Sequence, residues 1–427
     1  MYCRGFIFSF MGAALFHPAV ADQPETKSWL KISANEGNFS AELGGRIHFD
    51  TYLFDSDIED PISTTEFRRV RLAVTGHLWK WKYKLERDFS SSGTGGLRDV
   101  YIATEVLGGK LTIGNFKPYR SMEELTSSNE ITMMERSFTS ASGIYFGRSR
   151  QQGIGWHTHW GCYTFGAAGF NLRNPGAPRN EGLGAAGRIT WAPINDQIST
   201  VHLGISASHE NANRNSNPIE ADVAYAGRRG PTQLTALTPG GRDFFFDIVN
   251  DNGDQLFFFG NQGGKADIAG LEFAATYGPV YLQSEYAYGK FDGDYYLSEV
   301  VFEDFYGIPP TFACDPDNGC FIGDQDVKTW YIMGSWMITG EHKPYDSAKG
   351  VFRSAKPHSD WGAWELTARY ETIENKDIPD LEADSFRLGV NVYLNPRVRF
   401  MLNIILGDDE FTGDKTRQLA FRAQASW

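Results

Sequence analysis

From residue 39 onward, apolar and polar residues alternate along segments of about ten residues. Between residues 39 and 54, for example, Phe39, Leu43 and Ile47 share one parity, whereas Arg46 and His48 share the other. A period of two predicts β-strands whose two faces meet different surroundings. Sixteen such segments follow one another: residues 39–54, 67–79, 81–89, 97–106, 110–117, 150–159, 162–172, 183–192, 198–209, 265–277, 280–291, 327–339, 361–372, 384–394, 397–406 and 416–427.

The connections between these segments alternate in length. Short ones, such as residues 107–109 and 278–279, alternate with long ones, such as residues 118–149 and 210–264. A barrel inserted in an outer membrane has short periplasmic turns and longer external loops, and its closed sheet pairs every backbone group within the bilayer. The pattern therefore predicts an all-β fold, a transmembrane antiparallel up-and-down β-barrel of about 16 strands. The connection formed by residues 340–360 is longer than expected for a periplasmic turn.

The start of the chain has the pattern of a secretory signal. Arg4 precedes the apolar residues 5–16, and the small residues Ala19-Val20-Ala21 follow as a cleavage site, a pattern typical of a cleaved signal peptide. We therefore expect residues 1–21 to be a signal peptide and residues 22–38 to be an N-terminal periplasmic segment. Residues 39–427 would form the barrel domain.

Composition and charge narrow the function classes. The mean hydropathy of -0.37 excludes a bundle of membrane helices, and the net charge of -13 disfavours nucleic acid as a partner. Cys314 and Cys320 bracket a five-residue stretch, so in an oxidising compartment we expect them to form a loop disulfide. Cys162 is then expected to be unpaired. No spacing typical of a metal site or a hydrolase motif is found, and neither a metal nor another cofactor is expected.

Arginines on the polar parity of the first two strands are candidates for the lumen. Arg46 lies opposite the apolar set of its strand, and so do Arg69 and Arg71 in the next. Arg68 falls on the apolar parity at the outer end of its strand, where we expect it to curl over the rim. Guanidinium groups stay charged and can hold two phosphate oxygens at once. A ladder of such groups favours anions if no single site binds too tightly.

A second basic set is expected at the periplasmic mouth, where it could draw an anion out of the channel. Its members lie near short turns or within residues 340–360: Lys80, Lys82, Lys84, Lys110, Lys343, Lys349 and Lys356. The alternative interpretation is that these lysines only provide solubility. Acidic loops oppose anion preference, because residues 292–326 contain nine acidic residues and no Lys or Arg.

Several strings along the chain resemble the phosphate- and polyphosphate-selective porins known as the porin O/P family. These are Gly44-Gly45-Arg46-Ile47-His48-Phe49-Asp50, Phe67-Arg68-Arg69-Val70-Arg71, Gly114-Asn115-Phe116-Lys117-Pro118, Met134-Glu135-Arg136-Ser137, Thr339-Gly340-Glu341, Gly362-Ala363-Trp364-Glu365-Leu366 and Leu394-Asn395-Pro396-Arg397-Val398-Arg399. The resemblance implies a trimeric barrel in a Gram-negative outer membrane, with a constriction loop folded into the lumen. By this resemblance, the anion-binding positions of the family correspond to Arg46, Arg68 and Arg69 and, in the constriction loop, to Arg136. Lys117 and Arg120 are further candidates by their position at the start of the loop.

The expected function is passive diffusion of small anions, phosphate or polyphosphate, through a water-filled channel. The expected partners are these anions, outer-membrane lipid and lipopolysaccharide, and two further copies of the chain. The alternative is a general or sugar-accepting porin in which aromatic residues line a track. A barrel enzyme of the lipase kind would need a Ser and His pair on the lipid-facing parity, and none is found, so no enzymatic activity is expected.

Overall fold

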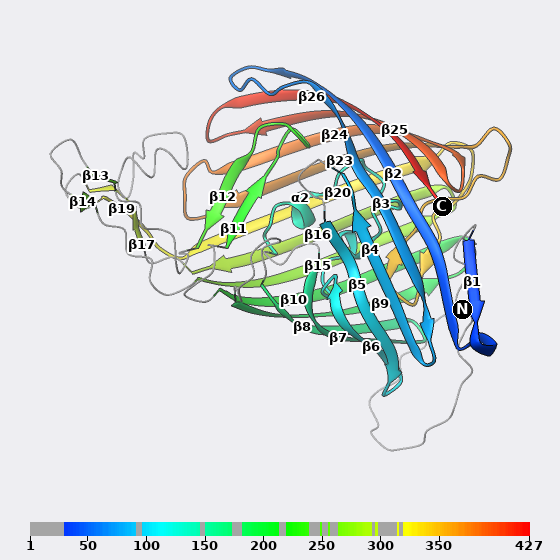
Figure 1. The fold of residues 1–427 in the computed structure, drawn as a ribbon. Helices are drawn as coiled ribbons and strands as arrows, with labels where there is room; N and C mark the ends of the chain where they lie inside the picture. The colour runs from blue at the N-terminus through cyan, green and yellow to red at the C-terminus, as the bar shows by residue number, and fades with distance from the viewer. Residues whose placement is uncertain are drawn as a thin grey trace.

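The computed structural model describes residues 30–90, 96–145, 150–172, 182–212, 219–238, 248–249, 255–256, 264–292, 295–297, 314–315 and 319–427. Sixteen strands pair with their neighbours along the chain, and the last pairs with the first, so that the sheet closes into an antiparallel barrel (Figure 1). They are β2 (Phe39–Ser56), β3 (Thr64–Leu78), β4 (Trp81–Asp88), β5 (Gly96–Val106), β6 (Gly109–Phe116), β7 (Gln151–Trp160), β8 (Tyr163–Asn171), β9 (Gly182–Asn195), β10 (Ser199–Ala212), β15 (Lys265–Tyr277), β16 (Val280–Phe291), β20 (Gln325–Met337), β23 (Ala363–Asn375), β24 (Glu382–Asn395), β25 (Val398–Asp409) and β26 (Asp414–Ser426). The predicted barrel is confirmed.

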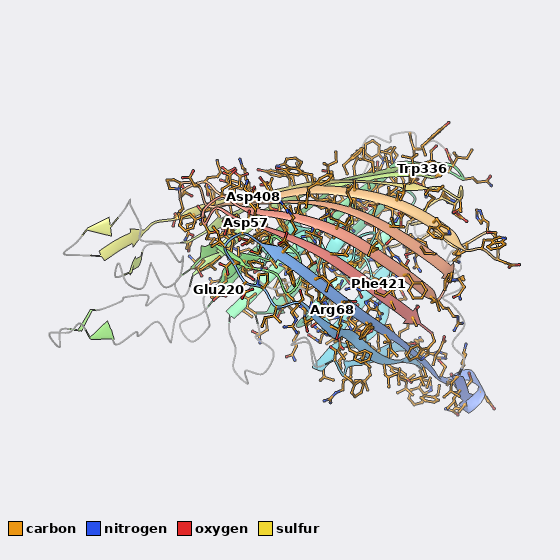
Figure 2. The ribbon with its side chains drawn as sticks, turned by 90° about the horizontal axis from the view of Figure 1, so that it is seen from above. Asp57, Arg68, Glu220, Trp336, Asp408 and Phe421 are labelled. Carbon is orange, nitrogen blue, oxygen red and sulfur yellow. The ribbon has the colours of Figure 1, made fainter. Side chains whose placement is uncertain are left out.

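Each strand presents one face to the outside and one to the lumen. In β25, Leu402, Ile404 and Leu406 are exposed on the outer face, whereas Asn403 and Ile405 between them are buried. Exposed tryptophans gather at the ends of strands near the short turns, as in the aromatic girdle of a membrane barrel. They are Trp79, Trp81, Trp160, Trp191, Trp336 and Trp364. Figure 2 shows Trp336 at one end of the barrel and Asp57 and Asp408 toward the other.

The segment before the barrel adds to the sheet. β1 (Leu30–Ala34) pairs with the first residues of β2, and the short helix η1 (Asn35–Gly37) connects the two strands. Residues 1–29, which include the predicted signal peptide, lie outside the described residues. Among the described residues, no helix is long and apolar enough to cross a membrane.

Three segments fold into the barrel. The constriction loop, residues 117–145, carries α1 (Met122–Leu125) and α2 (Phe138–Ala141), and Figure 1 shows α2 enclosed by the strands. The outer insert, residues 219–238, carries β11 (Glu220–Val223) and β12 (Gln233–Leu237). The inward turn, residues 338–362, carries β21 (Tyr345–Asp346) and β22 (Val351–Phe352). The constriction loop is confirmed, and the long connection after β20 is explained because it also enters the lumen.

Contacts across the lumen fix these segments in place. The backbone N–H of Phe138 donates to Glu371 Oε2 of β23 at 2.9 Å, and Tyr225 of the outer insert donates its hydroxyl to Asp414 at 2.8 Å. Arg188 of β9 donates to the carbonyl oxygen of Gly350 in the inward turn at 2.7 Å. The three segments therefore occupy part of the barrel interior and narrow its lumen.

Smaller strand pairs lie in the long loops: β13 (Ile248–Val249) with β14 (Gln255–Leu256), and β17 (Tyr295–Leu297) and β18 (Cys314–Asp315) with β19 (Gly319–Ile322). Cys314 and Cys320 stand directly opposite each other in the β18–β19 register, and their disulfide remains a prediction. Cys162 is disulfide-bonded, so the expectation that it is unpaired was wrong. Its partner lies outside the side chains that the structure describes. The sequence holds four cysteines, so a Cys314–Cys320 disulfide would leave only Cys3, within the predicted signal peptide, as a partner for Cys162 in the same chain.

Candidate functional site: the basic wall of the lumen

A β-bulge turns two consecutive arginines of β3 into the lumen. His48 of β2 pairs with Arg69, but the next residue, Phe49, pairs with Phe67, so Arg68 is an extra residue. Phe67 is 52% exposed on the outer face, whereas Arg68 and Arg69 are only 8% and 6% exposed. The expectation that Arg68 lies on the lipid-facing parity was therefore wrong, because strict alternation holds only until a strand contains a bulge.

Arg68 fixes the constriction loop to the barrel wall. Its Nε and Nη2 donate to the two carboxylate oxygens of Glu135 at 2.9 and 3.1 Å. Arg422 of β26 donates to the same carboxylate at 2.7 Å and also binds Asp50 of β2 through two hydrogen bonds of 2.7 and 2.6 Å. Charged groups removed from water need such paired, bidentate partners. Figure 2 shows Arg68 along the barrel wall, away from both ends.

Arg69 has a less complete set of partners. Its Nη1 lies 3.4 Å from Nδ1 of His48, and His48 Nε2 lies 2.9 Å from the amide oxygen of Asn129. Among the residues that the structure describes, no carboxylate lies within 4 Å of Arg69, and its Nε has no hydrogen-bond partner. A buried cation without a carboxylate in direct contact is costly, so this position suits an anion arriving from the lumen.

A second bulge concentrates charge on the next strands. In the β4–β5 pairing, Leu85 opposes Val100 and Arg87 opposes Leu97, so Glu86 faces two residues of β5, Arg98 and Asp99. The Glu86 carboxylate lies within 4 Å of four cationic groups: Arg46 at 3.8 Å, Arg71 at 3.3 Å, Lys84 at 3.3 Å and Arg150 at 3.7 Å. We call Arg46, Arg71, Lys84, Arg98 and Arg150 the basic wall.

The basic wall has more cations than carboxylates, and its cations are more accessible than two of those carboxylates, Glu86 and Asp88. Asp88 lies 2.7 Å from Arg71 and 3.7 Å from Arg98. Asp99 lies 2.6 Å from both Lys84 and Arg150. Five cations thus share three carboxylates. The Glu86 and Asp88 side chains are 2% and 0% exposed, whereas Asp99 is 15% exposed and so lies in the same range as four of the cations: Arg46 17%, Lys84 21%, Arg98 15% and Arg150 12%.

Two basic residues of the constriction loop continue this arrangement. Lys117 Nζ lies 3.5 Å from Glu124 Oε1, and Arg136 Nε lies 3.6 Å from Glu124 Oε2. Arg136 also donates to the carbonyl oxygen of Thr126 at 2.7 Å. One carboxylate therefore serves two cations here, although residues 117–145 as a whole contain four Glu against three Lys and Arg. Selectivity in a water-filled pore depends on such local charges rather than on the net charge of the chain.

Arg120 is separated from the other candidates. It is fully buried, forms an ion pair with Glu210 of β10 and donates to Ser208 at 2.8 Å. The rings of Tyr145 and Phe170 lie 4.9 and 5.3 Å from its guanidinium carbon. Arg120 therefore anchors the loop to the wall and does not face the passage.

The structure brings together part of the predicted lysine cluster. The charges of Lys349, Lys82 and Lys84 all act on Lys110, so these four groups share one region near the short turns. Lys80 and Lys356 are exposed near the same end of the barrel. Lys343 lies apart from them: its buried ammonium is 2.8 Å from Glu365 and donates to Thr132 of the constriction loop at 2.8 Å.

The base of the inward turn is held by a shared carboxylate. Asp346 lies 2.5 Å from Arg353 and 3.6 Å from Lys349. Burial alone would raise the pKa of Asp346, but these two cations hold that pKa below its ordinary value. The turn therefore keeps its ion pairs across the neutral pH range.

Sequence reasoning missed several cations of the barrel interior, Arg188 and Arg422 among them. Arg98 and Arg150 belong to the basic wall, and their inward orientation depends on a bulge and on a strand end. Arg228 and Arg229 of the outer insert both bind Glu66, at 2.5 and 2.7 Å. The only signal in the sequence was a second pair of adjacent arginines within a long connection, whose position in space no periodicity indicates.

Comparisons with known proteins agree with this geometry. The family described as "Phosphate-selective porin O and P" matches residues 41–235 and 247–426. Porin O of Pseudomonas aeruginosa is 25% identical over 436 aligned residues, which cover 92% of this chain and 91% of that protein.

Solved porins share the fold at much lower identity. The anion-selective porin from Comamonas acidovorans has a TM-score of 0.57 at 12% identity, covering 91% of this chain and 100% of its own. In-vitro folded OmpT of Vibrio cholerae, solved in a trimer form, has a TM-score of 0.51 at 10% identity, covering 91% and 99%. OmpF of Salmonella typhi has a TM-score of 0.52 at 12% identity, covering 93% and 100%.

Proposed function

Because this chain belongs to the phosphate-selective porin O and P family and is an outer-membrane porin of Gram-negative type, we propose that it conducts small anions passively, with phosphate as its preferred class. The observation that carries the proposal is the arrangement of charge on the basic wall. Five cations share three carboxylates there, and two of these carboxylates, Glu86 and Asp88, are more deeply buried than the cations. An anion in the passage therefore meets a positive surface.

The proposed route follows the cations from the outer end inward. Arg228 and Arg229 would attract an anion to the mouth, because two guanidinium groups there share one carboxylate. The anion would then pass Arg68 and Arg69, the basic wall and the lysines near the short turns. Each cation already has a protein partner or a neighbour, so none would hold the anion too tightly for release.

Arg69 would be the strongest single contact on this route. Its guanidinium has no carboxylate within 4 Å among the described residues. A phosphate could accept two parallel hydrogen bonds from it, which a lysine would not provide. The neighbouring Arg68 would add positive charge while holding the constriction loop.

The experiment that tests this proposal measures the ion selectivity of the channel in planar bilayers. With the purified protein in a potassium chloride gradient, we expect an anion-selective reversal potential, and millimolar inorganic phosphate should reduce the chloride current. Arg69→Gln removes one charge, which at about 4 Å in water corresponds to about 1 kcal/mol, so the block should weaken about fivefold. Arg417→Gln, at an exposed arginine of the barrel rim, should leave the block unchanged. A cation-selective potential without phosphate block would contradict the proposal.

A general or sugar-accepting porin is the second candidate. The half-buried rings of Tyr101 and Tyr119 on the lumen wall favour it, since aromatic rings can line a track for sugars. The bilayer measurement separates the two candidates. A sugar-accepting channel would show little anion preference, and a neutral sugar, rather than phosphate, would reduce its current.

We also propose a homotrimer in contact with outer-membrane lipid and lipopolysaccharide. The exposed apolar belt and its tryptophans match a lipid environment, and one of the structurally similar porins was solved as a trimer. Native mass spectrometry of the detergent-solubilised protein should give three times the mass of one mature chain. A monomeric mass at all detergent concentrations would contradict the trimer.

A further inference from the structure

Aromatic rings lie on the lumen wall next to the basic wall. Tyr101 of β5 stands opposite Lys84 of β4, so their side chains share the inner face. Tyr119, at the start of the constriction loop, stacks on His157 of β7 with ring centroids 5.2 Å apart. Tyr101 and Tyr119 pack against the same buried cluster, which includes Phe116. We call Tyr101, Tyr119 and His157 the aromatic shelf.

Two glycines allow the shelf to lie flat against the wall. A Cβ atom on Gly166 would approach Tyr119 Cγ to 2.6 Å, and one on Gly155 would approach Tyr119 Cε2 to 2.9 Å. The Tyr119 ring therefore occupies the space that side chains at these positions would fill. All three shelf residues are only half-buried, and inside a closed barrel their uncovered surface is reached from the lumen.

Cations border the shelf. The ammonium of Lys110 lies 5.3 Å from the centre of the Tyr101 ring. The charges of Lys82, Lys84 and Lys349 act on Lys110, so several ammonium groups share this region. An apolar planar surface and four ammonium groups thus lie side by side on the route proposed for anions. Two of these groups, Lys84 and Lys349, also pair with Asp99 and Asp346.

We propose that the aromatic shelf binds the ring of organic anions while the bordering lysines bind the acidic group, so that the channel accepts aryl phosphates and aromatic carboxylates. This inference rests on the proposed anion-conducting function and extends it to a substrate class. Inorganic phosphate has no apolar surface and gains nothing from the shelf. Ring pairing should therefore tighten binding of an aryl phosphate about three- to tenfold over an alkyl phosphate of the same charge.

The test compares three probes as blockers of chloride current in planar bilayers: phenyl phosphate, methyl phosphate and the uncharged phenyl glucoside. We expect phenyl phosphate to block at about three- to tenfold lower concentration than methyl phosphate, and phenyl glucoside not to block. In the double variant Tyr101→Leu/Tyr119→Leu, the two phosphates should block equally. The variant Tyr101→Phe/Tyr119→Phe keeps the rings and should retain the preference. Tyr286→Leu changes a tyrosine of the outer face and serves as the matched control.

The outcomes separate this inference from the proposed function. Equal block by phenyl and methyl phosphate in the wild type, or a preference that survives in the leucine variant, overturns the shelf while leaving phosphate conduction intact. Block by phenyl glucoside as strong as by phenyl phosphate overturns the assignment to anions. Loss of the preference in the leucine variant supports the shelf only if the phenylalanine variant keeps it, because a misfolded channel would not show both results.

Discussion

Replacing Glu86 by Gln should make the channel more anion-selective. Glu86 is a buried carboxylate of β4 within 4 Å of four cations, and the glutamine keeps its shape while removing its charge. The cations that face the lumen would remain, so the positive field in the passage should rise.

The magnitude follows from the distances. Arg46 lies 3.8 Å from Glu86, and an anion bound to Arg46 would add a hydrogen bond of about 3 Å, so that it lies about 7 Å from the carboxylate. Removing the repulsion of one unit charge at that distance is worth about 0.6 kcal/mol in water and about 2.4 kcal/mol at an effective dielectric constant of 20. Phosphate should therefore block the chloride current at a concentration lower by about threefold to about sixtyfold.

The assay is the phosphate titration of chloride current in planar bilayers, supported by the reversal potential. It is best performed near 0.1 M salt or below, where the Debye length is about 10 Å and the charge is not fully screened. Asp267→Asn removes an exposed carboxylate of the outer face and should not change the block. Migration of the unheated protein on electrophoresis checks that the variant folds. A folded Glu86→Gln channel with unchanged or weaker phosphate block would refute the reasoning that buried carboxylates limit the lumen field.

Three further predictions concern the loops and the processing of the chain. Lys343→Met breaks a buried ion pair with Glu365, which costs about 3–5 kcal/mol in stability. The inward turn should loosen, and single-channel recordings should show a noisier open current. A current as quiet as that of the wild type would contradict this role. In the unreduced, denatured protein, a thiol-alkylating reagent should leave Cys314 and Cys320 unlabelled, which peptide mass spectrometry can check. Alkylation of either cysteine would exclude a disulfide between them. N-terminal sequencing of protein from the outer membrane should begin at Asp22, and a retained leader would disprove the predicted cleavage.

The strands could be predicted from the sequence because the bilayer imposes a simple rule on them. A strand with lipid on one side and water on the other must alternate, and β15 and β16 have the same bounds as their predicted segments. The girdle tryptophans and the short turns follow from the same rule. Local sequence therefore specifies the barrel almost completely.

The site was only partly predictable, because alternation gives the face of a residue and not its partners. Arg46, Arg69 and Arg71 were expected on the inner face, where Arg69 and Arg71 are buried and Arg46 is half-buried, and their role in anion binding stays a prediction. Arg120 and Lys343 lie in segments that fold into the barrel, where distant strands determine their environment: Glu210 pairs with the first and Glu365 with the second. No local pattern encodes such long-range contacts, and the arginines of the outer insert were missed for the same reason.

The bulge at Arg68 also has an evolutionary consequence. Deleting that one codon would restore regular pairing between β2 and β3, with Phe67 still facing lipid, and would remove one lumen cation together with the clamp on Glu135. Inserting a basic residue at a comparable place in another strand would create a bulge and add one cation to the lumen. Channels of this architecture can therefore gain or lose pore charge through single-residue changes in length, so a gap in an alignment of such chains can report a change in conduction.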